Sequence, residues 1–511
     1  MSNSRSKNAI LNIAFGYAAQ IGILILSFVG RRIFLKFLSV DYLGINGLYS
    51  NILTVLSLAE LGLDAAVLYS LYKPVADNDI PLINSLLKYF KKIYIILALC
   101  IFMVGLALIP FLRFIIKSEL NSTDLIIYYL LFLINTVASY FVAHKVAFLS
   151  ACQEQRIQKI VTLSSNLILQ ILHIIVLLIW KNYYVYVSAT VATTIINNLI
   201  LNAICNKIHP HIKDKTELIS FDKAPIKKRI YSTFVYKIGG VAINNTDNIL
   251  ISILVSTAAV GFYSNYYTLI SAIQGFIAIV STSLISGIGN LVAGGDKKRQ
   301  YEIFNAALFF YHFVAALGFV GYSFLLNDVI TVWLGEKYLF DSKTVFIIAF
   351  NFYITNAITP IWMYREANGL FEEVRYLMLI RAAINIVLSV VLGKLCGTFG
   401  ILLATAISLM VTSLWYEPNI LFKNVFRIPV SKYWIKQLTY FATTSLGFLI
   451  SYLIVRHFSG GILQLVFKAI VVVMVVTIPF FAILYNSKEL KKLTNFLKKG
   501  KIKCLCSKTK R

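Results

Sequence analysis

Runs of about 20 mostly apolar residues recur along the whole chain, with short polar stretches between them. Each run is long enough to cross roughly 30 Å of hydrocarbon as an α-helix. The runs do not alternate apolar and polar positions, as the strands of a membrane barrel would. The sequence therefore predicts an all-α polytopic membrane protein with about 14 transmembrane helices, at residues 9–29, 43–70, 93–112, 125–144, 160–180, 183–204, 230–255, 259–285, 303–325, 345–364, 376–396, 399–421, 437–455 and 462–485.

The longest basic connection between these spans covers residues 206–229 and separates six spans from the next six. We take it as the boundary between two halves, and the two spans that follow the second half as an addition. The predicted organisation is an N-terminal six-helix bundle, a basic cytoplasmic linker, a C-terminal six-helix bundle, two additional transmembrane helices and a basic cytoplasmic tail, at residues 1–205, 206–229, 230–422, 423–486 and 487–511.

A weak internal repeat supports the two halves. Shifting the sequence by 217 positions lays residues 31–79 on residues 248–296 without a gap, so that "FLSVDYLG" covers "LVSTAAVG". A similar shift lays "AHKVAFLS" on "MYREANGL" and aligns Lys145 with Arg365. Because six helices return the chain to the same face of the membrane, the repeats are predicted to be parallel.

The composition excludes a soluble domain, and the distribution of charge predicts an orientation. The chain is 59% hydrophobic and 14% charged, with a formal net charge of +26. Sorting its 48 Lys and Arg by alternating connections puts 35 on the side shared by both termini and 10 on the other, with Lys394 at the end of the eleventh span counted among the 10. Three more lie deep inside spans (Lys237, Arg381 and Lys468). The positive-inside rule then places both termini in the cytoplasm. The basic tail predicts contact with anionic membrane lipids and not with nucleic acid.

Carboxylates inside the second and seventh spans are candidates for ion coupling. Glu60 and Asp64 are four residues apart, so both side chains share one helix face, and Asp247 lies in the seventh span. Exposing one such charge to lipid costs about 3 kcal/mol, so these groups are expected to face inward. They either bind a coupling ion, H⁺ or Na⁺, or form a salt-bridge network that holds the helices together.

The seventh and eleventh spans each carry a polar stripe. Lys237, Asn244 and Asn248 fall within about 40° on a helical wheel of 100° per residue. Arg381 and Asn385 are one turn apart in the eleventh span. Since lipid offers such groups no partners, each stripe predicts a wet or protein-lined face. The alternative for the amides is a structural role in hydrogen bonds between helices.

Signatures of catalysis are missing from the sequence. It contains no Walker A motif, no G-x-S-x-G motif and no connection longer than about 30 residues that could hold a catalytic domain. Its His and Cys residues show no metal-ligand spacing, and the six cysteines are expected to be reduced thiols. We therefore expect a protein that is not an enzyme and that has no metal or organic cofactor.

Four segments in this order, "LAELGLDAAV", "NNTDNILIS", "VWLGEKY" and "YREANGLF", resemble the polysaccharide transporter (Wzx-type) flippase family of the multidrug/oligosaccharidyl-lipid/polysaccharide (MOP) exporter superfamily. The likeness extends over residues 7–485. It implies a V-shaped, MATE-like alternating-access transporter made of the two parallel six-helix repeats and two C-terminal helices. It also implies that undecaprenyl-pyrophosphate-linked oligosaccharides cross the bacterial plasma membrane for capsular or O-antigen-type polysaccharide.

The resemblance implies basic residues in a central cavity, and Lys237, Arg381 and Arg31 occupy the corresponding helices. Asn244, Asn248 and Asn385 would line the same cavity. The implied partners are the lipid-linked oligosaccharide and the glycan polymerase machinery.

Two alternatives share the superfamily and stay open. One is a flippase for the peptidoglycan lipid precursor. The other is a cation-coupled multidrug exporter, whose cavity should be net acidic, whereas the charges inside the spans here are of both signs.

Overall fold

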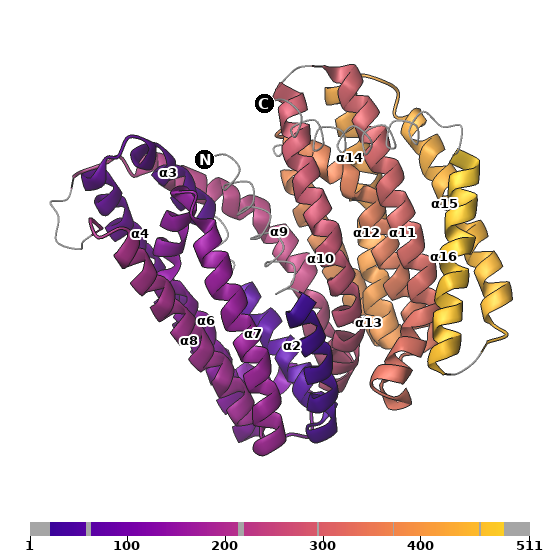
Figure 1. The fold of residues 1–511 in the computed structure, drawn as a ribbon, viewed down its shortest axis with the longest axis horizontal. Helices are drawn as coiled ribbons and strands as arrows, with labels where there is room; N and C mark the ends of the chain where they lie inside the picture. Colours follow the sequence, from indigo (N-terminus) through magenta and orange to yellow (C-terminus); the bar gives the residue numbers. More distant parts are fainter. Residues whose placement is uncertain are drawn as a thin grey trace, which may run out of the picture. The chain divides into compact units, whose positions relative to one another are not determined.

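The computed structural model describes residues 21–57, 63–212, 219–293, 296–370, 373–458 and 461–484. These residues form helices joined by short connections, and none of them belongs to a β-strand (Figure 1). By its internal contacts the chain divides into two compact units, residues 1–264 and 265–511. Each unit is described by itself.

The first unit begins with helical residues 21–37 and ends inside α10. Its helices are α2 (Val40–Leu56), α3 (Leu63–Ala76), α4 (Ile80–Ala107), η2 (Ile109–Phe111), α5 (Leu112–Ile115), α6 (Ser122–Ala151), α7 (Gln155–Ile179), α8 (Tyr183–Ile208), α9 (Ala224–Leu254) and the start of α10 (Thr257–Ala293). The second unit holds the rest of α10, α11 (Lys297–Trp333), η3 (Glu336–Tyr338), α12 (Ser342–Ala367), α13 (Arg375–Val411), α14 (Ser413–Leu421), the π-helical turn Phe422–Phe426, α15 (Ser431–Val455) and α16 (Ile462–Leu484).

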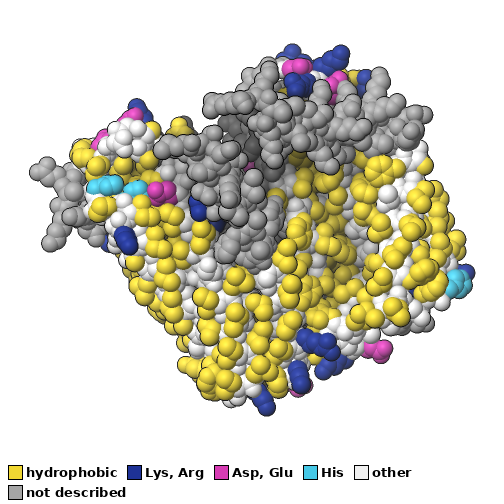
Figure 2. Space-filling model, in the orientation of Figure 1, with side chains coloured by type: hydrophobic (Ala, Val, Ile, Leu, Met, Phe, Trp, Pro, Cys, Tyr) yellow, Lys and Arg dark blue, Asp and Glu magenta, His cyan; other side chains and the backbone are white. Residues whose placement is uncertain are grey.

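Most helices match the spans predicted from the sequence, but the predicted second span, residues 43–70, is divided between α2 and α3. Among the described residues, nine helical segments are long and apolar enough to cross a membrane, and one of them, Tyr376–Phe426, covers two predicted spans. On the face shown in Figure 2, hydrophobic side chains cover the sides of the helices, and Lys and Arg gather near the helix ends. The chain is therefore a multi-pass membrane protein.

In the first unit, α6 is the central helix. It packs against α2, α3, α4, α7 and α8, while α9 packs against α2 and α3. Because of these α9 contacts, the division between the units falls later in the chain than the predicted linker at residues 206–229. The predicted linker rests on the longest basic connection and the number of spans on each side of it, and not on contacts, so the predicted domain boundaries stay a prediction.

Two glycines let α2 and the start of α10 touch backbone to backbone. A Cβ atom on Gly44 would lie 1.9 Å from the carbonyl oxygen of Thr257, and one on Gly261 would lie 2.4 Å from that of Val40. The 217-residue shift maps Val40 onto Thr257 and Gly44 onto Gly261, so the two contacts are equivalent under the repeat. Such an exchange of partners is typical of a local two-fold relation, and it supports the alignment of the two halves.

In the second unit, α11 and α12 form the most extensive helix pair, and α16 packs against α11 and α15. The predicted spans 376–396 and 399–421 meet at Gly397, inside α13. Its backbone angles, φ 61° and ψ −140°, suit glycine because a side chain would clash there. A Cβ atom on Gly400 would also lie 2.0 Å from the carbonyl oxygen of Leu392. These two glycines permit the sharp reversal between the eleventh and twelfth spans.

Candidate functional site

A pocket of about 670 Å³ lies among α2, α6, α7 and α8 of the first unit. Twelve of its fifteen lining residues are polar, and none of the fifteen is Asp, Glu, Lys or Arg. A polar cavity of this size is unexpected in a helical bundle that spans a membrane, because buried polar groups cost free energy. The lining residues are Asn46, Ser50, Leu53, Thr54, Ser57, Phe132, Asn135, Thr136, Ser139, Tyr140, His173, Tyr186, Val187, Thr190 and Thr194.

Four of the nine hydroxyl groups in this pocket use their proton within their own helix. The hydroxyls of Thr54, Ser57, Thr136 and Ser139 each donate to a backbone carbonyl three or four residues earlier, at 2.7–3.0 Å. Their oxygen lone pairs remain as acceptors. The Oδ1 atom of Asn135 is buried and accepts no hydrogen bond from the described residues. At these five positions the pocket presents hydrogen-bond acceptors.

An aromatic pair forms one wall of the pocket, where α7 meets α8. The imidazole of His173 stacks on the ring of Tyr186, with 3.7 Å between centroids and 20° between planes. The His173 Nε2 atom lies 3.0 Å from the hydroxyl oxygen of Thr190. The predicted cavity cation Arg31 lies one turn before Phe34, whose ring packs edge-on against Tyr186 at 5.2 Å, and its guanidinium donates to the Ser264 hydroxyl at 2.9 Å. The helix that carries this cation thus packs against the wall.

The structure places the predicted stripe of the seventh span on α9. The side chains of Lys237 and Asn244 lie outside the described structure. Asn248 faces α2, since its Nδ2 atom would lie 3.8 Å from a Cβ atom on Gly47, and its buried Oδ1 atom has no hydrogen-bond partner among the described residues. Asp247 is half-buried on the same helix. Of this stripe, the structure shows only that Asn248 lies against α2.

The other predicted site residues are only partly described. Glu60 lies outside the described residues, as does the side chain of Asp64, so the structure does not report on their common face. Arg381 and Asn385 are on α13 of the second unit, with exposed fractions of 8% and 0%. The amide of Asn385 donates to the Thr405 hydroxyl at 3.0 Å, which joins the two arms of α13. Burial of both side chains agrees with an inward-facing stripe but does not assign it a role.

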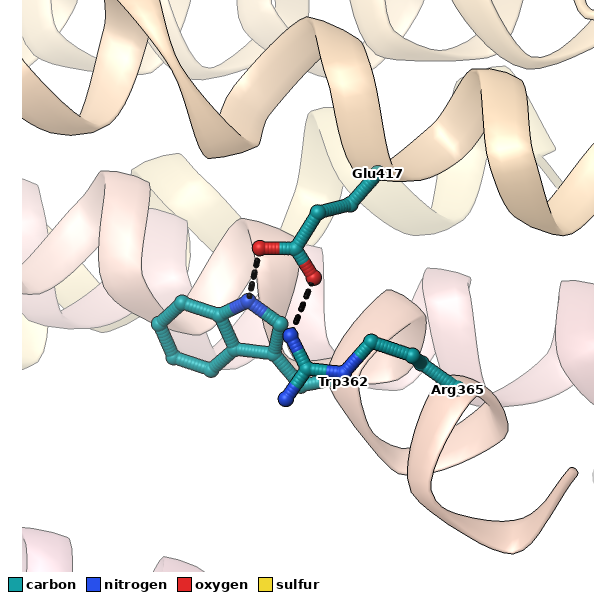
Figure 3. A network of polar contacts seen from close by, with 3 residues as sticks. All are labelled: Trp362, Arg365 and Glu417. Carbon is teal, nitrogen blue, oxygen red and sulfur yellow. Dashed lines mark hydrogen bonds and ion pairs between the residues drawn. The ribbon is translucent and has the colours of Figure 1, made fainter. Parts of the chain in front are cut away.

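A buried ion pair joins α12 to α14 (Figure 3). A guanidinium nitrogen of Arg365 lies 2.5 Å from Oε2 of Glu417, and the indole N–H of Trp362 donates to Oε1 at 3.2 Å. The Glu417 side chain has no exposed surface. Both carboxylate oxygens are occupied, so this network holds helices together and leaves little room for a ligand.

Lys145, which the repeat aligns with Arg365, makes the corresponding connection in the first unit. Its ammonium donates to Oδ1 of Asn202 and of Asn206 on α8, both at 2.6 Å. Each aligned cation therefore bonds to the last helix of its own predicted six-helix bundle. This shared arrangement is a second structural agreement with parallel repeats.

Among the described residues, no three His, Cys, Asp or Glu side chains gather as a candidate metal site.

Comparison with known proteins identifies the family. The family described as "Polysaccharide biosynthesis protein" matches residues 10–285, which is more than half of the 511 residues. The chain belongs to this family. No curated protein sequence matches it.

Solved structures show that this polysaccharide biosynthesis family member shares the fold of MOP-superfamily transporters. An inward closed structure of the lipid II flippase MurJ is 17% identical with a TM-score of 0.69, over 93% of this chain and 99% of that one. An inward-facing MATE-family multidrug resistance transporter of the MOP superfamily is 12% identical with a TM-score of 0.60, over 78% and 94% of the two chains. At these identities the likeness establishes the fold alone.

Sequence reasoning missed two carboxylates of this family member. Glu417 lies inside the predicted span 399–421, so an acidic residue within an apolar run was the signal that could have found it. Asp328 accepts from the ammonium of Lys468 at 2.6 Å, joining α11 to α16. The predicted span ends at residue 325, which places Asp328 in a connection, whereas α11 continues to Trp333.

Proposed function

We propose that the protein is a flippase that moves undecaprenyl-pyrophosphate-linked oligosaccharide repeat units across the bacterial plasma membrane by alternating access. The product would be the precursor of a capsular or O-antigen-type polysaccharide. Family membership supports a role in polysaccharide biosynthesis. The fold supports transport, and the similar MurJ structure is that of a lipid II flippase.

The observation that carries the proposal is a large uncharged pocket of hydroxyls and amides whose aromatic wall packs against the helix that carries Arg31. A glycan presents many hydroxyls, which such a pocket can bind. A pyrophosphate requires a cation, and one charge pair at 4 Å contributes about 4 kcal/mol at an effective dielectric of 20, before desolvation is subtracted. Arg31 is the described candidate for that cation, and Lys237 and Arg381 are proposed to meet the pyrophosphate elsewhere on its path.

The chemistry of the pocket favours a saccharide over the cargo of a drug exporter. An exporter of organic cations needs acidic groups at its binding site, and the described lining of this pocket has none. A peptidoglycan lipid precursor also carries sugars and pyrophosphate, so a flippase for that precursor is the second candidate. The described MurJ-like fold is the observation that favours it.

Energy coupling is proposed to depend on the carboxylates of the second and seventh spans. If Glu60 or Asp64 binds H⁺ or Na⁺, then Glu60→Gln or Asp64→Asn should abolish transport driven by an imposed ion gradient while the amount of folded protein stays the same. If both variants transport normally, the pair is structural and coupling lies elsewhere.

Deleting the gene tests the proposed function. Cells without the protein should accumulate one lipid-linked oligosaccharide on the cytoplasmic leaflet and lose the corresponding surface polysaccharide, and a plasmid copy of the gene should restore both. Accumulation of the peptidoglycan precursor instead would select the second candidate. An unchanged pool of lipid-linked sugars would contradict both.

A further inference from the structure

We infer that the pocket among α2, α6, α7 and α8 is a subsite for one neutral sugar residue of the transported glycan. This inference rests on the proposed function, because it assumes that the cargo carries a glycan. It goes further because it assigns a class of ligand to a site in the first unit. The predicted cavity residues Arg381 and Asn385 belong to the second unit.

The size and charge of the pocket exclude several other ligands. A volume of about 670 Å³ falls in the range of small-molecule sites and is far larger than one desolvated ion needs. A hard cation would favour carboxylate ligands, and an anion would favour Lys or Arg. The fifteen described lining residues include neither kind. A neutral polar ligand is the class that remains.

The direction of the hydrogen bonds narrows this class. Four pocket hydroxyls donate their proton to a carbonyl of their own helix, and the buried Oδ1 atom of Asn135 accepts no hydrogen bond from the described residues. At these five positions the pocket can accept hydrogen bonds, so a ligand that supplies several donors of its own fits it. A pyranose does so, because every free hydroxyl carries a proton that it can donate.

The aromatic wall suits the other surface of a sugar. A pyranose has a flat face of C–H groups that packs on aromatic rings, and this wall presents the half-buried ring of Tyr186, held in place by the buried imidazole of His173 stacked on it. The same wall contacts the helix that carries Arg31, because the ring of Phe34, one turn after Arg31, packs edge-on against Tyr186 with 5.2 Å between centroids. We therefore assign the pocket to a sugar close to the pyrophosphate and not to the far end of the glycan.

Binding of a free oligosaccharide tests the subsite. The probe is the repeat-unit oligosaccharide released by mild acid from the lipid-linked pool of the same cells. It is titrated into the purified full-length protein, and saturation-transfer NMR measures the dissociation constant. Asn135→Leu should raise that constant by about tenfold, near the upper limit for one neutral hydrogen bond, and Thr194→Val by about threefold. Asn166→Leu is the matched control, because Asn166 is exposed on α7 outside the pocket, and it should change nothing.

Several results would overturn the inference. One is unchanged affinity in both pocket variants while their melting temperatures match the wild type. Another is a wild-type protein that does not bind the oligosaccharide. A third result is that the pocket variants bind the oligosaccharide normally but their transport responds differently from the wild type to an imposed Na⁺ or pH gradient. That result would make the pocket an ion site.

Transport of the intact lipid-linked oligosaccharide by reconstituted wild-type protein is measured in parallel. If the wild type transports it but the pocket variants bind the free glycan normally, the subsite is wrong and the proposed function stands. If the wild type transports no lipid-linked glycan, the proposed function fails regardless of the pocket variants.

Discussion

Replacing Gly44 by alanine tests the close contact between α2 and α10. The new Cβ atom would lie 1.9 Å from the carbonyl oxygen of Thr257, whereas real Cβ contacts do not fall below 3.0 Å. The helices must therefore separate by about 1.1 Å, since a backbone oxygen cannot rotate away. Overpacking of this kind costs about 1–3 kcal/mol, and alanine returns about 1 kcal/mol through its higher helix propensity. We expect a net loss near the upper limit, about 2 kcal/mol.

Thermal unfolding of the purified protein measures this loss. A decrease of about 2 kcal/mol should lower Tm by about 4 °C for a unit of this size. Gly275→Ala on α10 is the control, because a Cβ atom there would meet no atom within 4 Å, and it should be neutral or stabilising.

The double variant provides a further check on the same crossing. Once Gly44→Ala has separated the helices, Gly261→Ala should cost less than it does alone, so the two effects should be less than additive. If Gly44→Ala is as stable as Gly275→Ala, or if the two losses are fully additive, the helices do not cross as described.

Glu417→Gln should lower the free energy of unfolding by about 3–5 kcal/mol, because it removes the buried carboxylate that faces a guanidinium. Glu366→Gln is the control and should have little effect. Equal melting temperatures of the two variants would contradict the buried pair. Reporters fused in the connection between α8 and α9 and at the C-terminus should report the cytoplasm, and a reporter at Lys181 should report the outside. An external signal from the connection between α8 and α9 would refute the predicted topology. Burial, with added repulsion from Glu154, raises the pKa of the Cys152 thiol to about 11. Alkylation of a variant that keeps only this cysteine should therefore be slow at pH 7.5 and increase toward pH 11, and rapid labelling at pH 7.5 would refute that environment.

Hydrophobic runs predicted most helices well, because a helix that crosses a bilayer needs about 20 mostly apolar residues to match the thickness of the hydrocarbon. The repeat also held at particular residues, since the aligned Gly44 and Gly261 exchange equivalent contacts in the structure. Helix ends were less predictable, and α11 extends past its predicted end because polar residues such as Asp328 can remain helical when a cation faces them.

The pocket could not be predicted from the sequence. Its polar residues come from four helices, and each one alone fits a structural hydrogen bond between or within helices. Only their positions in space show that Asn135, His173 and Thr194 share one cavity. The partner of Arg365 was unpredictable for the same reason, because Glu417 is 52 residues away in the sequence.

Flipping in proteoliposomes tests the central claim most directly. Purified protein is reconstituted with the lipid-linked oligosaccharide of its own cells, and a membrane-impermeant lectin measures how much glycan faces outward over time. We predict protein-dependent movement of this substrate, faster than that of the peptidoglycan precursor. Movement no faster than in protein-free vesicles, or movement of the peptidoglycan precursor alone, would contradict the assignment.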